Sequence, residues 1–170
     1  MAIDLQEVWQ ANKSLAIPPD WKPLAKGAEF VQVVCPIDYD VLTEQGLLFR
    51  ATAHIYTPDR DVTFQIEYHS PSGKGGAFSR IEWRPRRPHG NKGIGPPQFR
   101  FKDITGCHFH SFDLNWNHSK TLVQRGSLPI AVPIVPAPPS YQDALAFVEK
   151  EFRIKGVMAM LTPPWTDKML

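Results

Sequence analysis

The chain has little cysteine and no long apolar run, and both shortages narrow the classes of protein to which it can belong. Its 170 residues include two cysteines, Cys35 and Cys107, without the close spacing of a zinc ribbon or a redox motif. Two isolated cysteines are typical of free thiols in a reducing compartment. No apolar run reaches the ~18 residues that span a bilayer, and the opening stretch lacks the apolar core of an export signal. The sequence therefore predicts a cytoplasmic protein with no membrane partner.

Charge is divided along the chain, although the net charge is only +2. Residues 1–70 hold five Lys or Arg against ten Asp or Glu, whereas residues 71–120 hold nine against three. The basic segment also contains four of the six histidines: His89, His108, His110 and His118. Positive charge beside histidines favours an anionic partner such as a phosphate backbone, although a solvated basic face would have the same composition.

Hydrophobic periodicity predicts an α+β fold. Apolar and polar residues alternate over 47–57, 62–70 and 77–84, as in antiparallel strands joined by turns. Ser140 and Asp143 form a cap-like pair before a segment whose apolar residues share one helix face. We expect a curved antiparallel sheet, a meander of about five to seven strands, with a short N-terminal helix and one C-terminal helix packed on it.

The same pattern predicts a single domain over residues 1–170. Its expected parts are an N-terminal helix and Pro-rich lead-in (1–27), the sheet (28–139) with a basic loop (85–98), a helix (140–153) and an apolar tail (154–170). Within the sheet, GCHFHSFDLNW at 106–116 is expected to be extended. The prolines of 127–140 favour an edge strand or a polyproline connector.

His108 and His110 lie two positions apart in a predicted strand, so their side chains share a face and leave the backbone roughly 6–7 Å apart. Three interpretations fit: a metal site, an acid–base pair, or structural histidines with Ser111 or Asp113 as hydrogen-bond partners. A metal site needs a third ligand, and Cys107 and Asp113 face the other way on a regular strand. The His-x-His strand resembles the first motif of the cupin barrel, but no histidine follows residue 120 to complete that motif.

The acid–base interpretation is favoured, with no metal and no cofactor expected. An imidazole titrates near pH ~6.5, so one histidine can accept a proton while the other donates one. RNA cleavage needs this chemistry and a cation to stabilise the charge that develops on the phosphate. We predict that His108 and His110 are the catalytic pair of a metal-independent ribonuclease. The candidate phosphate- or nucleic-acid-binding residues are Arg84, Arg86, Arg87, His89 and Lys92.

The order of elements over 47–153 resembles the TumE-like toxins of prokaryotic toxin–antitoxin and mobile-element loci. The resemblance rests on the His108-x-His110 strand, the glycine before it and LPIAVPI after it. It implies a toxin-like domain that acts on RNA, with an antitoxin as its protein partner and with His108 and His110 at its site. The basic loop and the tail at 156–170 have no counterpart in that family.

Two alternatives remain open. A non-catalytic interaction protein, such as a phage or mobile-element inhibitor or a toxin–antitoxin partner, would dock on another protein through the basic loop. A cupin-like metal enzyme would use the histidines as ligands. The partner is therefore RNA or another phosphate-bearing molecule in the leading hypothesis and a protein in the first alternative. The sequence sets no oligomeric state.

Overall fold

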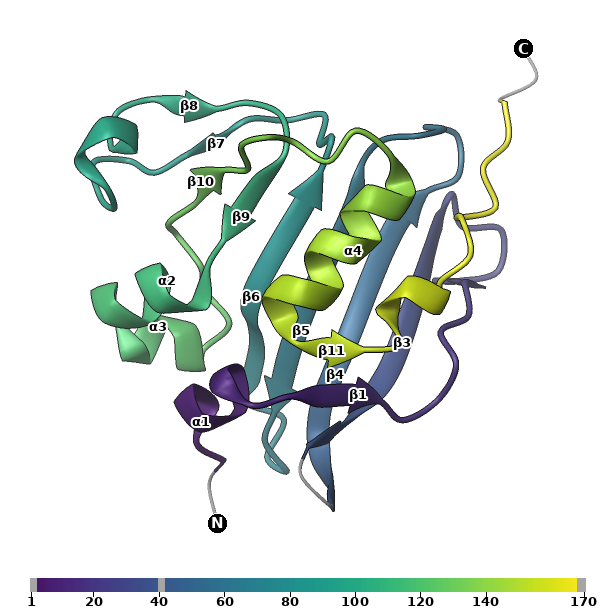
Figure 1. Ribbon diagram of the computed structural model, residues 1–170, viewed down its shortest axis with the longest axis horizontal. Helices are drawn as coiled ribbons and strands as arrows, with labels where there is room; N and C mark the ends of the chain where they lie inside the picture. The colour runs from purple at the N-terminus through teal and green to yellow at the C-terminus, as the bar shows by residue number, and fades with distance from the viewer. Residues whose placement is uncertain (1–2, 40–41, 168–170) are drawn as a thin grey trace.

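A curved nine-stranded sheet, with one helix lying across a face of it, forms the frame of the protein (Figure 1). The computed structural model describes residues 3–39 and 42–167. The longer strands are β3 (Phe30–Tyr39), β4 (Leu42–His54), β5 (Val62–His69) and β6 (Gly75–Trp83). These four pair in sequence order and antiparallel, so the predicted meander is confirmed.

Short strands extend the meander on both sides, in the order β10-β9-β6-β5-β4-β3-β1-β11, with β2 also beside β3. They are β1 (Lys13–Leu15), β2 (Lys22–Pro23), β9 (His108–His110), β10 (Val132–Pro133) and β11 (Ile154–Lys155). The pair β1–β11 is parallel, which makes the sheet mixed. A separate two-stranded sheet joins β7 (His89–Gly90) and β8 (Asp103–Ile104), so the predicted basic loop contains a short strand.

The two predicted helices are present and two short ones join them, which confirms the α+β class. The helices are α1 (Leu5–Gln10), α2 (Phe112–His118), α3 (Lys120–Gln124) and α4 (Tyr141–Phe152), with the 3₁₀ turns η1 (Pro97–Phe99) and η2 (Val157–Ala159). Ser140 caps α4 as predicted, because its hydroxyl accepts a hydrogen bond from the Asp143 amide at 3.1 Å. The apolar face of α4 is buried on the sheet and ends in Phe152, whose ring packs against those of Trp9 and Phe109.

The prediction of an extended segment over 106–116 is wrong after His110. Ser111 is instead the N-cap of α2, and its hydroxyl accepts a hydrogen bond from the Leu114 amide at 3.2 Å. The helix turns Phe112 into the core, where its ring lies 5.5 Å from that of Trp9. Asp113 accepts a hydrogen bond from the Trp9 indole at 3.3 Å, whereas the Nδ1 atoms of His108 and His110 bond to backbone carbonyls.

Lys13 is a buried cation that closes the end of α1. Its ammonium group donates hydrogen bonds to the carbonyls of Val8 and Ala11, at 2.8 and 2.7 Å. Burial, with the charge of Arg153 as a smaller cause, lowers the pKa of Lys13 to about 8 from its ordinary 10.5. Between these two pH values the unfolded chain holds a proton that the folded chain has released.

The contribution of Lys13 to the free energy of unfolding is therefore expected to rise between about pH 8 and about pH 10, by roughly 2 kcal/mol. Below that window both states are protonated at Lys13, and this group adds no slope. The Lys13→Met variant should lose the rise, as measured by urea unfolding across the window. Lys22→Met, at an exposed lysine of β2, should keep it. An unchanged slope in Lys13→Met would contradict the assignment.

Candidate functional site

Strand pairing brings Glu82 to the two histidines that the sequence singles out. In the antiparallel pair β6–β9, Glu82 lies opposite His108 and Arg80 lies opposite His110. Side chains alternate along a strand, so these four share the face of the sheet that is opposite α4. Phe109 points the other way and packs on Phe147 of α4, with ring centroids 6.2 Å apart.

The cluster of Glu82, His108 and His110 is compact and largely buried. One carboxylate oxygen of Glu82 lies 3.4 Å from Nε2 of His108, and the other lies 3.8 Å from Nε2 of His110. Each of the three residues offers one ligand atom, and these three atoms all lie within 4.8 Å of one another. The two histidines are 1% and 2% exposed, whereas the Glu82 side chain is 23% exposed. Glu82 is therefore the member of the cluster nearest to solvent.

Backbone carbonyls fix which nitrogen of each imidazole carries the proton. Nδ1 of His108 donates to the Gly106 carbonyl at 2.9 Å, and Nδ1 of His110 donates to the Leu128 carbonyl at 2.8 Å. A carbonyl only accepts hydrogen bonds, so Nδ1 must bear the hydrogen and Nε2 of the neutral ring has a free lone pair. Both Nε2 atoms are buried and have no hydrogen-bond partner within the described residues. Such orphaned atoms are uncommon in folded proteins and call for a physical explanation.

The electrostatic environment gives Glu82 and His110 different charges near neutral pH. Burial, with the charge of His89 as a smaller cause, lowers the pKa of His110 to about 3. Burial opposes ionisation of Glu82, but His108 and the positive charge of Arg80 outweigh it and hold the pKa of its carboxyl below the usual value. The cluster therefore contains a carboxylate beside a neutral imidazole that presents a lone pair.

His89 completes a group of three imidazoles. Its ring centroid lies 4.6 Å from that of His110 and 5.9 Å from that of His108. Nε2 of His89 donates to the Pro129 carbonyl at 2.9 Å, so the nitrogen left unprotonated in its neutral ring is Nδ1. The sequence groups His89 with the phosphate-binding arginines, and the structure places its ring against the histidine pair.

A pocket of about 590 Å³ lies beside the exposed edge of Glu82. Its lining includes Arg86 and Arg87 from the basic loop. Arg86 is held by Asp61 at 2.7 Å, and Arg87 is exposed and makes no ion pair within the described residues. The pocket therefore combines two carboxylates, those of Glu82 and Asp61, with two guanidinium groups, of which that of Arg87 is left to bind a phosphate.

Two of the other predicted phosphate-binding residues are placed differently. Arg84 donates to the carboxylate of Asp59 at 2.7 Å and to the Pro139 carbonyl at 2.7 Å, and it stacks on the Trp83 ring. These contacts connect the end of β6 with the turn at Asp59 and with the segment before α4, so we interpret Arg84 as a structural residue. Lys92 has φ of +53° in the turn after β7, and its side chain is exposed. No contact in the described residues links Lys92 to the pocket.

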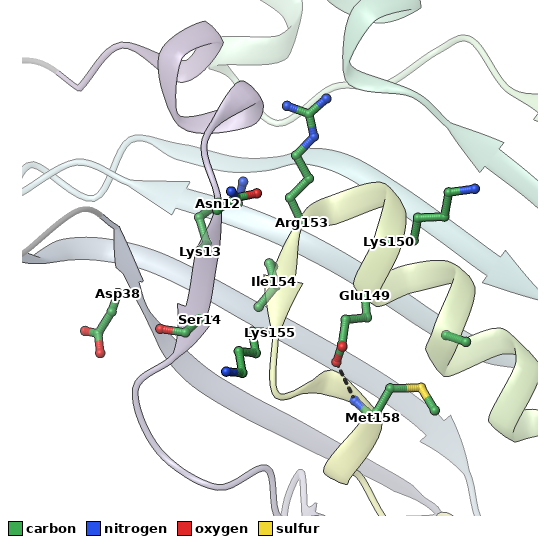
Figure 2. A pocket seen from close by; sticks show the side chains of 11 residues that line it. Asn12, Lys13, Ser14, Asp38, Glu149, Lys150, Arg153, Ile154, Lys155 and Met158 are labelled. Carbon is green, nitrogen blue, oxygen red and sulfur yellow. Dashed lines mark hydrogen bonds between the residues drawn. The ribbon is translucent and has the colours of Figure 1, made fainter.

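A larger pocket, of about 750 Å³, lies between β1, β11 and α4 (Figure 2). Two of its charged groups, Glu149 and Arg153, already make structural contacts. Glu149 accepts hydrogen bonds from the amides of Met158 and Gly156, at 2.9 and 3.2 Å, and Arg153 donates to the Gln10 carbonyl. None of the histidines lines it. We therefore place the candidate site at the Glu82 cluster.

Glu82 is the residue that the sequence analysis missed. One signal was present, because Glu82 and Arg80 are charged residues on an otherwise apolar strand, AFSRIEW. Taken as a whole, the site is a largely buried two-histidine, one-carboxylate cluster beside a pocket lined by both carboxylates and guanidinium groups. No known family's model matches the chain, and no curated protein or solved structure matches it. Among the described residues, no helix is both long and apolar enough to cross a membrane.

Proposed function

We propose that the protein binds RNA in the pocket beside Glu82 and cleaves its phosphodiester chain there. One observation carries the proposal: the carboxylate that contacts both buried histidines also lines a pocket with Arg86 and Arg87. Guanidinium groups bind phosphate oxygens through paired hydrogen bonds and stabilise the negative charge of a transition state. The proposal thus accounts for the position of the cluster and for the charge of the loop.

The chemistry needs only groups that the pocket and the RNA provide. The 2′-hydroxyl attacks the adjacent phosphorus, a bond forms between them, and the bond from phosphorus to the 5′-oxygen breaks. The products are a 2′,3′-cyclic phosphate and a free 5′-hydroxyl. The cluster takes the proton from the attacking hydroxyl and returns it to the leaving oxygen through Glu82, its one member that lines the pocket, with His108 and His110 behind it. Arg86 and Arg87 offset the charge that gathers on the phosphate.

In a cell, this activity would make the protein toxin-like. The likeness of the His108-x-His110 strand to the TumE-like toxins supports a place in a prokaryotic toxin–antitoxin or mobile-element locus. An RNA target implies that the protein works in the cytoplasm. A ribonuclease that damages its own host needs restraint, which gives a protein antitoxin as the expected partner.

The test is an RNA cleavage assay with the purified protein and charge-reversed variants. Arg87→Glu should lower the cleavage rate by about 100-fold, because it removes one cation from the phosphate and adds repulsion. Lys150→Glu makes the same change on α4, which covers the opposite face of the sheet, and should cleave like the wild type. RNA that stays intact with the wild-type protein, or an equal rate in Arg87→Glu, would refute the proposal.

A second candidate function, docking on a protein through the basic loop, is favoured by one observation. Phe101 lies just after the basic loop, between η1 and β8, and is 89% exposed, and the flanking Arg100 and Lys102 are exposed as well. An exposed aromatic ring between cations is typical of a contact residue in a protein interface. Loss of biological activity in Phe101→Ser, with cellular RNA intact in the wild type, would favour docking over cleavage.

A further inference from the structure

We propose that Glu82, His108 and His110 bind a divalent transition-metal ion. The ion would lie at the buried end of the pocket, and its part in RNA cleavage rests on the function proposed above. Metal binding itself does not depend on that function. The inference reverses the expectation from the sequence that the histidines work without metal, because the structure supplies the third ligand that the strand alone lacks.

The arrangement of electron pairs carries the argument. The Nε2 lone pairs of His108 and His110 converge on the carboxylate of Glu82, and both nitrogens are buried without a hydrogen-bond partner in the described part of the chain. Three electron-rich groups that face one another, two of them out of contact with water, repel each other unless a cation lies between them. Arg80, the cation next to Glu82 on this face, is already bonded through Nε to Gln65 at 3.1 Å.

The distances fit a metal ion better than a proton. With bonds of about 2.0–2.2 Å to nitrogen and oxygen, a tetrahedral ion holds its ligand atoms roughly 3.3–3.5 Å apart. Here the two contacts to Glu82 measure 3.4 and 3.8 Å, and the full set of ligand atoms lies within 4.8 Å. Small side-chain movements would therefore close the site around an ion. A proton shared by one imidazole and Glu82 would still leave the other Nε2 without a partner.

The surroundings of the ligands also match those of metal sites. Histidine ligands usually donate their second nitrogen to a carbonyl or carboxylate, which fixes the ring and its tautomer. His108 and His110 do so to Gly106 and Leu128. Two imidazoles and one carboxylate suit zinc or ferrous iron, whereas calcium and magnesium prefer oxygen ligands. Three protein ligands leave a coordination position, and the partly exposed Glu82 places the pocket beside it.

The experiment uses Zn²⁺ as the probe and the whole, chelator-treated protein. Calorimetric titration should show one ion bound per chain. Glu82→Gln, His108→Asn and His110→Asn should each weaken binding by at least about 100-fold, more than the 10–100-fold that loss of an outer hydrogen-bond partner costs. His118→Asn changes an exposed histidine of α2 and should bind Zn²⁺ like the wild type. Equal binding by the wild type and the His108→Asn, His110→Asn double variant would overturn the proposal.

A second measurement needs no substitution and so does not depend on whether a variant folds. The ¹⁵N resonances of Nε2 in His108 and His110 should shift on addition of Zn²⁺ to the wild-type protein, while those of His118 should not. Unshifted Nε2 resonances would equally overturn the proposal. Zn²⁺ bound at the three residues with RNA left intact would support the metal site and refute the ribonuclease. RNA cleavage at full rate by the metal-free protein, with no Zn²⁺ uptake, would support the ribonuclease and refute the metal site.

Discussion

Replacing both histidines of β9 by asparagine is expected to lower RNA cleavage by at least about 1000-fold and to leave the fold in place. The Asn amide can take over the donor role of Nδ1 toward the carbonyls of Gly106 and Leu128, so the buried hydrogen bonds are retained. It has no atom at the position of Nε2. The cluster therefore loses its proton acceptor, or its metal ligands, while the strand keeps its pairing.

The measurement compares initial cleavage rates of the wild type, the double variant and His118→Asn on the same RNA. Far-ultraviolet circular dichroism and thermal unfolding check that the variant is folded. His118 is exposed at the end of α2, so its replacement should leave the rate unchanged. A folded double variant that still cleaves RNA at the wild-type rate would remove His108 and His110 from the chemistry.

Phe152→Ala is expected to cost about 3–5 kcal/mol of the free energy of unfolding. The Phe152 ring is fully buried where α4 meets the sheet, and it contacts the rings of Trp9 and Phe109. Its removal leaves a cavity between α1, α4 and β9, which neighbouring side chains refill only in part. Urea unfolding at neutral pH measures the change.

Phe101→Ala makes the same substitution at a ring that is 89% exposed. Its effect should stay within about 0.5 kcal/mol, because little apolar surface is lost from the core. If the two variants were equally stable, the packing of α4 on the sheet would be wrong. The pair also separates a role of Phe101 in docking from a role in stability.

The elements that local sequence patterns determine could be predicted. Alternation over 62–70 gave the strand β5, and the Ser140–Asp143 pair with its apolar helical stripe gave α4 nearly to the residue. The aromatic residues after His110 favour β structure and so suggest a strand. The segment is helical instead, because the Ser111 hydroxyl caps the first turn of α2.

The candidate site was predicted in part, and the missing part is tertiary. The spacing of His108 and His110 was enough to place both side chains on one face. Glu82 could not be found in this way, because it meets them only through the register of β6 with β9, across the intervening loop. Nothing local in the sequence sets that register. Nor could the sequence show that the His89 ring lies against both imidazoles.

The parallel pair of β1 with β11 has a consequence for how the molecule is assembled during synthesis. Lys13 lies opposite Ile154, and the Lys13 amide donates to the Arg153 carbonyl at 2.8 Å. The strand β11, which covers this edge of β1, is thus made by the ribosome long after β1. Until those residues emerge, the nascent chain carries an open strand that can pair with a neighbour. Shortening the chain before Ile154 would make that vulnerable state permanent, so truncated forms should aggregate.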